Sequence, residues 1–180
     1  MSDADKIHIN FDRDGFWGFP DVPFHQQMGI EFAREDDGAP DVSLPHDPDL
    51  VSEDGEQSPA ALYSIAEIAS ALRVCDELGA DAKDLPEGMY PVMLAREVSF
   101  RCVAPAFGDI AAHTRLLDDR DELVAKIKAR RKGMVRIAVQ VADGDRQTAA
   151  EAQFDFYVRV MSEERLLAMT AAAVGSGAGN

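Results

Sequence analysis

The 180-residue sequence predicts an α+β fold in which an antiparallel β-sheet wraps around one long central helix. Two observations carry this prediction: a long apolar helical segment at residues 58–79, and strand-like alternation of apolar and polar residues on both sides of it. An antiparallel sheet with one apolar face needs a cover, and a long apolar helix needs partners around it. Wrapping the sheet around the helix satisfies both requirements.

The central helix has sequence signals at both ends. Ser58 is a suitable N-cap, because its hydroxyl can accept a hydrogen bond from a first-turn N–H, and Pro59 fits the first helical position. Gly79 suits the left-handed residue that ends a helix. The segment is about 20 residues, or roughly 30 Å long. Apolar residues cover most of its circumference, so we expect a buried helix.

One narrow polar stripe interrupts this apolar surface. Tyr63, Glu67 and Ser70 lie at i, i+4 and i+7, with Glu67 in the middle of the helix. A carboxylate held against an apolar surface is costly unless it is paired or protonated, which makes Glu67 the first functional candidate. A stripe that simply faces water is the alternative, and helix periodicity does not decide between them.

Two strands are expected before the helix and four after it. Ile30 and Phe32, then Val42 and Leu44, flank a turn-rich insert and predict a hairpin. The later strands are predicted at 92–103, 109–117, 134–142 and 146–160, the last two joined by an Asp-Gly turn. In the first of these, Leu94, Val98, Phe100 and Cys102 are predicted to share one face.

A short amphipathic helix is expected between the later strands, over residues 120–132 and ending at Gly133. The domain organisation that follows is an N-terminal arm at 1–22 with several aromatic residues, and a single domain at 23–160. Residues 161–180 are expected to form a short helix, capped by Ser162, and a disordered tail.

Composition excludes several classes of protein. A net charge of −15 argues against a nucleic-acid partner, because a duplex binder needs a basic footprint. No apolar run approaches the roughly 18 residues of a membrane span, and the first residues lack a signal-peptide pattern, so we expect a cytoplasmic protein with no membrane contact. The four histidines show no metal-ligand spacing, and Cys75 and Cys102 are expected as buried free thiols.

Charge is distributed unevenly along the chain. Residues 120–136 carry seven basic residues against two acidic ones, on an otherwise acidic protein. Lys128, Arg130, Arg131 and Lys132 could therefore receive an anionic ligand. A solvated helix face that offsets the acidity elsewhere explains the same cluster.

Three stretches carry a resemblance to a known family: MGIEF with the following VSLP hairpin; DGEQSPAALYSIAEIASAL; and VSFRCVAPAFGDIAA with RIAVQVADGDRQTAAEAQFDFYVR. Over roughly residues 23–159, the chain resembles the hotdog-fold thioesterase-like superfamily in its PaaI-related branch. It is similar to uncharacterised hotdog domains of the YiiD C-terminal type. The resemblance implies a hotdog domain over 23–160 and homodimers or dimers of dimers.

The resemblance also implies an activity, hydrolysis of an acyl-CoA or similar thioester, with no cofactor apart from the CoA of the substrate. Glu67 falls at the acidic position that relatives use, which implies a general base on water. The start of the helix, at Ser58, Ala60 and Ala61, would polarise the thioester carbonyl. Tyr63 and Ser70, one turn either side of Glu67, would orient the water. In such proteins the helix start and the acid can come from different subunits.

The sequence departs from the family pattern at the start of the helix. Ser52 stands where an Asn is often found and Ser58 where a His opens the helix, and Pro59 and Ala60 replace two glycines. Pro59 has no N–H to donate. A non-catalytic acyl-binding or assembly protein of the same fold is therefore the competing class. A hydratase ranks third, because such enzymes pair an Asp with a nearby His and this helix has none.

Overall fold

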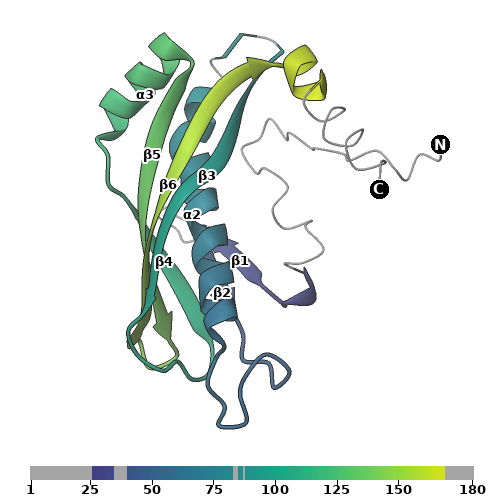
Figure 1. Ribbon diagram of the computed structural model, residues 1–180, viewed down its shortest axis with the longest axis vertical. Coiled ribbons are helices and arrows are strands. Elements are labelled where there is room, and N and C mark those ends of the chain that lie inside the picture. Colours follow the sequence, from purple (N-terminus) through teal and green to yellow (C-terminus); the bar gives the residue numbers. More distant parts are fainter. Residues whose placement is uncertain (1–25, 35–39, 83–84, 87, 169–180) are drawn as a thin grey trace, which may run out of the picture.

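The computed structural model describes residues 26–34, 40–82, 85–86 and 88–168 (Figure 1). Within them, six antiparallel strands form one sheet in the order β1-β2-β4-β5-β6-β3. The strands are β1 Glu31–Arg34, β2 Pro40–Leu44, β3 Met89–Cys102, β4 Ile110–Leu116, β5 Lys132–Asp143 and β6 Thr148–Ser162. The sequence predicted this α+β class, with two strands before the helix and four after it, and the structure confirms it.

The helix α2, Pro59–Ala82, runs through the middle of the molecule with the sheet curled around it (Figure 1). Its apolar residues are buried against β2, β4 and β5, as the sequence predicted. The predicted end at Gly79 is wrong, because the helix continues to Ala82. Two of the three added residues are alanines, the strongest helix former, which offsets the cost of an internal glycine.

Within the described residues, the strand β3 lies at one edge of the sheet and pairs with β6 alone. A β-bulge between Ala95 and Glu97 shifts its register. The predicted common face of Leu94 and Val98 is therefore wrong: Val98 pairs with the core residue Phe154, while Leu94 pairs with Tyr157 on the opposite face. An extra residue inside a strand reverses the alternation that follows it.

The short helix α3, Arg120–Arg130, lies at the end of the molecule where α2 finishes (Figure 1). Asp119 caps its start, accepting a hydrogen bond from Glu122 N–H, and Arg131 ends it in the left-handed conformation with φ 54°. Gly133, predicted as the helix end, is instead buried in β5, where a Cβ would stand 2.7 Å from the Ile127 side chain. The glycine lets α3 approach the sheet closely.

A buried ion-pair cluster ties the two helices together. The Glu77 carboxylate lies 2.6 Å from Arg73 on the preceding turn of α2 and 3.2 Å from Arg120 at the start of α3. Arg120 also donates to the backbone carbonyl of Glu77 at 3.1 Å. Because Glu77 is almost fully buried, these contacts fix where α3 sits on α2.

One of the two cysteine thiols is buried in the core and the other is exposed at the surface. Cys75 is buried and free, as predicted. The prediction for Cys102 is wrong, because this free thiol is exposed at the last residue of the edge strand β3. At the C-terminal end, residues 163–168 are helical and Ser162 Oγ accepts from Arg165 N–H at 3.4 Å. The N-terminal arm and the tail from 169 lie outside the described residues.

Candidate active site

The backbone N–H groups in the first turn of α2 differ in whether they have a hydrogen-bond acceptor. Ser58 Oγ accepts from Ala61 N–H at 3.2 Å, and the Ser58 carbonyl accepts from Leu62 N–H at 3.2 Å. Pro59 has no N–H. Ala60 is left as the one first-turn donor without a hydrogen-bond partner among the described residues, and its side chain is exposed. Of the two predicted donors, Ala61 is already engaged and Ala60 is available.

A glutamine that sequence reasoning missed holds this helix start in place. Gln57 is only 1% exposed; its backbone N–H donates to Ala106 at 2.9 Å and its side-chain amide donates to Gly108 at 2.8 Å. Between these two partners, Phe107 bridges to Glu56 and stays half exposed beside the helix start. Gln57 lies in a loop without periodicity, so no pattern in the sequence could have singled it out.

The polar stripe of α2 is partly exposed. Glu67 is exposed in the single chain, and it interacts electrostatically with Tyr63 one turn earlier. The Tyr63 ring packs edge-on against Phe100, with centroids 5.4 Å apart, and lies 6.0 Å from Phe154. Burial, and secondarily the Glu67 carboxylate, raise the pKa of Tyr63. The phenol therefore stays protonated at neutral pH, as a donor close to Glu67.

Ser70, the third residue of the stripe, does not join this exposed group. It is completely buried, and its hydroxyl donates to the backbone carbonyl of Glu67 at 2.7 Å. This bond replaces the water that Ser70 was predicted to orient. The structure therefore brings Tyr63 and Glu67 together and separates Ser70 from them.

The surface around Glu67 borders the edge strand β3. Val98 pairs with Phe154 of β6 and lies on the same face of the sheet, and it remains 37% exposed. Phe100, two residues further on the same face, is the ring that packs against Tyr63. The contact between Phe100 and Tyr63 links this part of β3 to the polar stripe of α2 that carries Glu67.

The basic cluster lies at the other end of the molecule. Lys128, Arg130, Arg131 and Lys132 are all exposed around the end of α3. Lys128 lies beside Leu78, and 18 residues of helix separate Leu78 from Ala60, which is about 27 Å along the axis. Within one chain, the structure does not bring the cluster to the start of α2.

Within the described residues, no group of three or more His, Cys, Asp or Glu side chains could hold a metal ion. No helix in that part of the chain combines the length and apolar character needed to cross a membrane.

Known structures share this architecture. A Pseudomonas aeruginosa protein of unknown function, named a probable thioesterase, superposes with a TM-score of 0.62 over 78% of this chain and 89% of its own, at 21% identity. The chain has a hotdog fold. A thioesterase from Haemophilus influenzae matches with a TM-score of 0.54 at 14% identity, covering 78% of this chain and 83% of that one.

A third neighbour of this hotdog fold was crystallised with CoA. The Bacillus halodurans protein has a TM-score of 0.55 and 17% identity, over 76% of this chain and 78% of its own. The structural neighbours are thus thioesterase-superfamily proteins, and at these identities the likeness establishes the fold. No protein-family profile matches the sequence, and no curated protein matches it either.

Proposed function

We propose that this protein is an acyl-CoA thioesterase. The observation that carries the proposal is that α2 presents an available Ala60 N–H at its start and an exposed Glu67 two turns later, two groups that a homodimer would bring to one site from different chains. Thioester hydrolysis needs a donor for the carbonyl oxygen and a base for water. The thioesterase names of the structural neighbours support the same reaction class.

The helix start would stabilise the charge that develops on the thioester oxygen. Ala60 N–H would donate to it, and the positive end of the helix dipole would add to the stabilisation. Water would then attack the carbonyl carbon and the carbon–sulfur bond would break. The products are a free carboxylic acid and the CoA thiol, which leaves with a proton.

Glu67 would take the proton from the attacking water. Seven residues separate it from Ala60, which is about 10 Å along the helix axis. A general base acts over one hydrogen bond or one bridging water, so Ala60 and Glu67 of the same chain are poorly spaced to serve one carbonyl. A second chain that pairs along β3 would bring its own Glu67 to this helix start. We therefore propose a homodimer with each site shared between two chains.

CoA itself would contact the basic cluster of a neighbouring chain. Antiparallel pairing of β3 with its copy places the α3 end of one chain beside the end of the other chain where α2 begins. Arg130, Arg131 and Lys132 would then receive the phosphates as charge-assisted hydrogen-bond partners. The CoA bound to the Bacillus halodurans neighbour supports a CoA ligand for this fold.

The alternative is a hotdog protein that binds acyl groups or an assembly partner without hydrolysis. Pro59 favours it, because proline removes one N–H from the turn where the reaction needs donors. The fully buried Ser70 favours it as well, since one predicted water ligand is lost. Activity measurements separate the two classes.

The experiment compares two substitutions at one position across a panel of acyl-CoA esters. Ala60→Pro removes the available N–H in a turn that tolerates proline, whereas Ala60→Gly keeps it. We expect kcat for the best substrate to fall by about 10²-fold in Ala60→Pro, the cost of one oxyanion donor. Ala60→Gly should stay close to wild type.

Circular dichroism and the thermal midpoint of each variant check that the helix start survives. Equal kcat in folded Ala60→Pro and Ala60→Gly would remove Ala60 from the mechanism. Absence of hydrolysis by the wild-type protein across the whole panel, with acyl-CoA still bound, would favour the non-catalytic class.

A further inference from the structure

A row of apolar side chains crosses the outer face of the sheet, the face turned away from α2. It consists of Leu94 of β3, Tyr157 of β6 and Met134 of β5, which are cross-strand partners in register. Side chains of directly opposed partners on one face lie about 5 Å apart, so these three form a continuous apolar strip. Leu94 is 67% exposed, the highest value among the large apolar residues that the structure describes, and Tyr157 and Met134 are half-buried. The strip is therefore open to solvent in the single chain.

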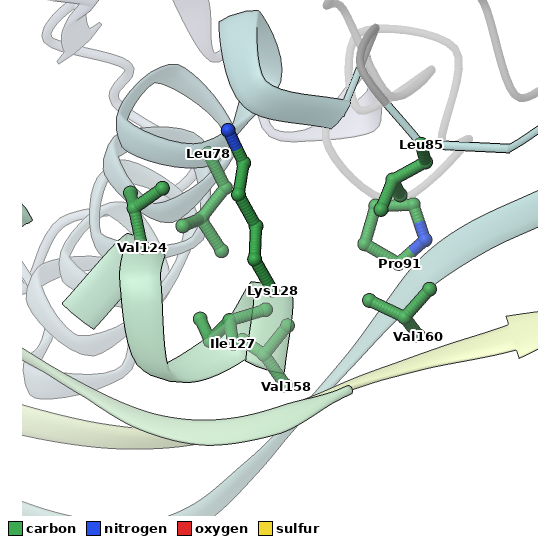
Figure 2. A pocket seen from close by; sticks show the side chains of 8 residues that line it. All are labelled: Leu78, Leu85, Pro91, Val124, Ile127, Lys128, Val158 and Val160. Carbon is green, nitrogen blue, oxygen red and sulfur yellow. The ribbon is translucent and has the colours of Figure 1, made fainter. Parts of the chain in front are cut away.

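At this end of the molecule, α2 and α3 lie against the opposite face of the sheet. Val158 follows Tyr157 on β6, is buried, and points to that opposite face because side chains alternate along a strand. Figure 2 shows Val158 next to Ile127 of α3, with Leu78 of α2 and Val124 of α3 close by. The strip thus contributes little to the core of one chain. An apolar surface with a charged rim is typical of a protein interaction site.

Charged residues flank the strip on both sides. Two residues after Tyr157, Arg159 lies in register with Lys132 of β5. Two residues before Tyr157, Asp155 lies in register with Glu97 of β3. Alternate residues of a strand share a face and lie about 7 Å apart, so both rows border the strip directly. The strip separates a basic row from a row that contains two acidic residues.

The difference in charge is clearest on β6, the middle strand of the three. On β5, Arg136 also belongs to the acidic row, but its guanidinium lies 2.7 Å from the Asp118 carboxylate, which offsets its charge. On β3, the exposed Arg96 stands at the bulge beside Glu97 and offsets that charge as well. What remains is one basic and one acidic residue of β6, at equal spacing on either side of Tyr157.

We propose that this outer face binds the same face of a second copy of the chain, with Tyr157 on the two-fold axis. An axis that crosses the strands at Tyr157 stacks the two sheets with β6 antiparallel to its copy. Arg159 of each chain then lies opposite Asp155 of the other, and the apolar strip packs on itself. Two equal ion pairs around an apolar centre give the self-complementarity that a two-fold interface needs. An axis parallel to the strands would instead place Arg159 opposite its own copy.

This interface is separate from the β3 pairing proposed above and does not rest on the proposed function. Antiparallel pairing of β3 with its copy has a two-fold axis perpendicular to the sheet, so the outer faces of both chains stay on the same side. Two such dimers can therefore stack into a tetramer. The strip is small beside a standard interface, so we expect this second association to be the weaker one, with a dissociation constant on the order of 10–100 µM.

Sedimentation equilibrium over about 1–300 µM protein tests the association, which appears as a doubling of mass with concentration. Arg159→Asp and Asp155→Arg each place like charges across the axis, and we expect each to weaken the association at least about tenfold. The double variant Arg159→Asp/Asp155→Arg exchanges the two charges and restores both ion pairs. We expect its affinity to lie within about threefold of wild type.

Two further variants complete the comparison. Leu94→Ser shortens the apolar strip without changing charge and should weaken the association about fivefold. Lys126→Asp is the matched control for Arg159→Asp: it makes the same charge change at an exposed position on α3, which packs against the other face of the sheet, and should associate like wild type.

Circular dichroism and the thermal midpoint verify that each variant is folded. A wild-type protein whose mass does not double up to the highest concentration would overturn the proposal and leave the strip to another partner. Single charge variants that associate like wild type would overturn it too, as would a folded double variant that associates no better than the single ones. None of these measurements depends on hydrolysis, so their outcome is independent of the proposed reaction.

Discussion

Three consecutive residues at the start of α2 use their backbone in different ways. Ser58 caps Ala61, Pro59 carries no donor, and Ala60 keeps its N–H available. The sequence indicated the cap and the proline, because both follow from residue type. It did not indicate that the cap would use Ala61, since that depends on the rotamer of one serine.

The stripe on α2 shows the same limit. The sequence placed Tyr63, Glu67 and Ser70 on one face, which is correct for helical spacing. Exposure differs within that face, since Glu67 is exposed and Ser70 is buried. Burial depends on what packs over each residue, and a helical repeat carries no information about that.

At the residue scale, the buried thiol of Cys75 should make the stability of the protein depend on pH in the alkaline range. Burial, and then the Asp76 charge, raise the pKa of Cys75 well above its usual value. The unfolded chain releases this proton near pH 8.5 and the folded chain keeps it. Above that pH, loss of the thiol proton stabilises the unfolded state alone. The free energy of unfolding should therefore fall by about 1.4 kcal/mol per pH unit.

Urea unfolding between pH 8.5 and 10 measures this slope. Cys75→Ala should show a slope shallower than wild type by this amount, while Cys102→Ala, at the exposed thiol, should keep the wild-type slope. A wild-type slope in Cys75→Ala would mean that the buried thiol does not contribute to the pH dependence.

At the scale of elements, the sequence predicted which segments form helices and strands more reliably than where they end. The α2 helix passes through Gly79 and α3 stops two residues before the predicted end. Both helix ends were predicted at a glycine. Gly133 instead lies in β5, where the missing side chain lets Ile127 pack close to the strand. A glycine in a sequence signals conformational freedom or close approach, and only packing shows which.

The bulge in β3 changed which face of the sheet the side chains occupy, and not only where an element ends. It moved Leu94 to the outer face and left Val98 on the face of Phe154. Strict alternation could not predict it, because a bulge inserts one residue without changing composition. The shifted strand presents Val98 on the face of the sheet where Phe154 packs against Tyr63 of α2.

At the scale of the whole molecule, β3 forms one edge of the sheet. Among the described residues, no strand pairs with its outer side, and a 14-residue edge strand favours pairing with another chain. Val98 belongs to this strand and is 37% exposed. We expect the homodimer proposed above to form here and to cover Glu67.

Val98→Glu tests this interface. The substitution puts a charge on the open edge and should convert the dimer to a monomer, with loss of thioesterase activity in parallel. Leu167→Glu is the matched control, because Leu167 is 62% exposed on the C-terminal helix and is not a residue of β3. Analytical ultracentrifugation measures the oligomeric state of each variant, and activity assays are run in parallel. If both variants remain dimeric, β3 is not the interface.

Replacing Glu67 by glutamine tests the proposal that this carboxylate is the base in thioester hydrolysis. Steady-state hydrolysis of the best acyl-CoA substrate should be compared in wild type, Glu67→Gln and Glu164→Gln, the last an exposed glutamate on the C-terminal helix. We predict that kcat falls by about 10²-fold or more in Glu67→Gln, the usual contribution of a general base, and is unchanged in Glu164→Gln. Undiminished kcat in a folded, dimeric Glu67→Gln would show that Glu67 is not the base.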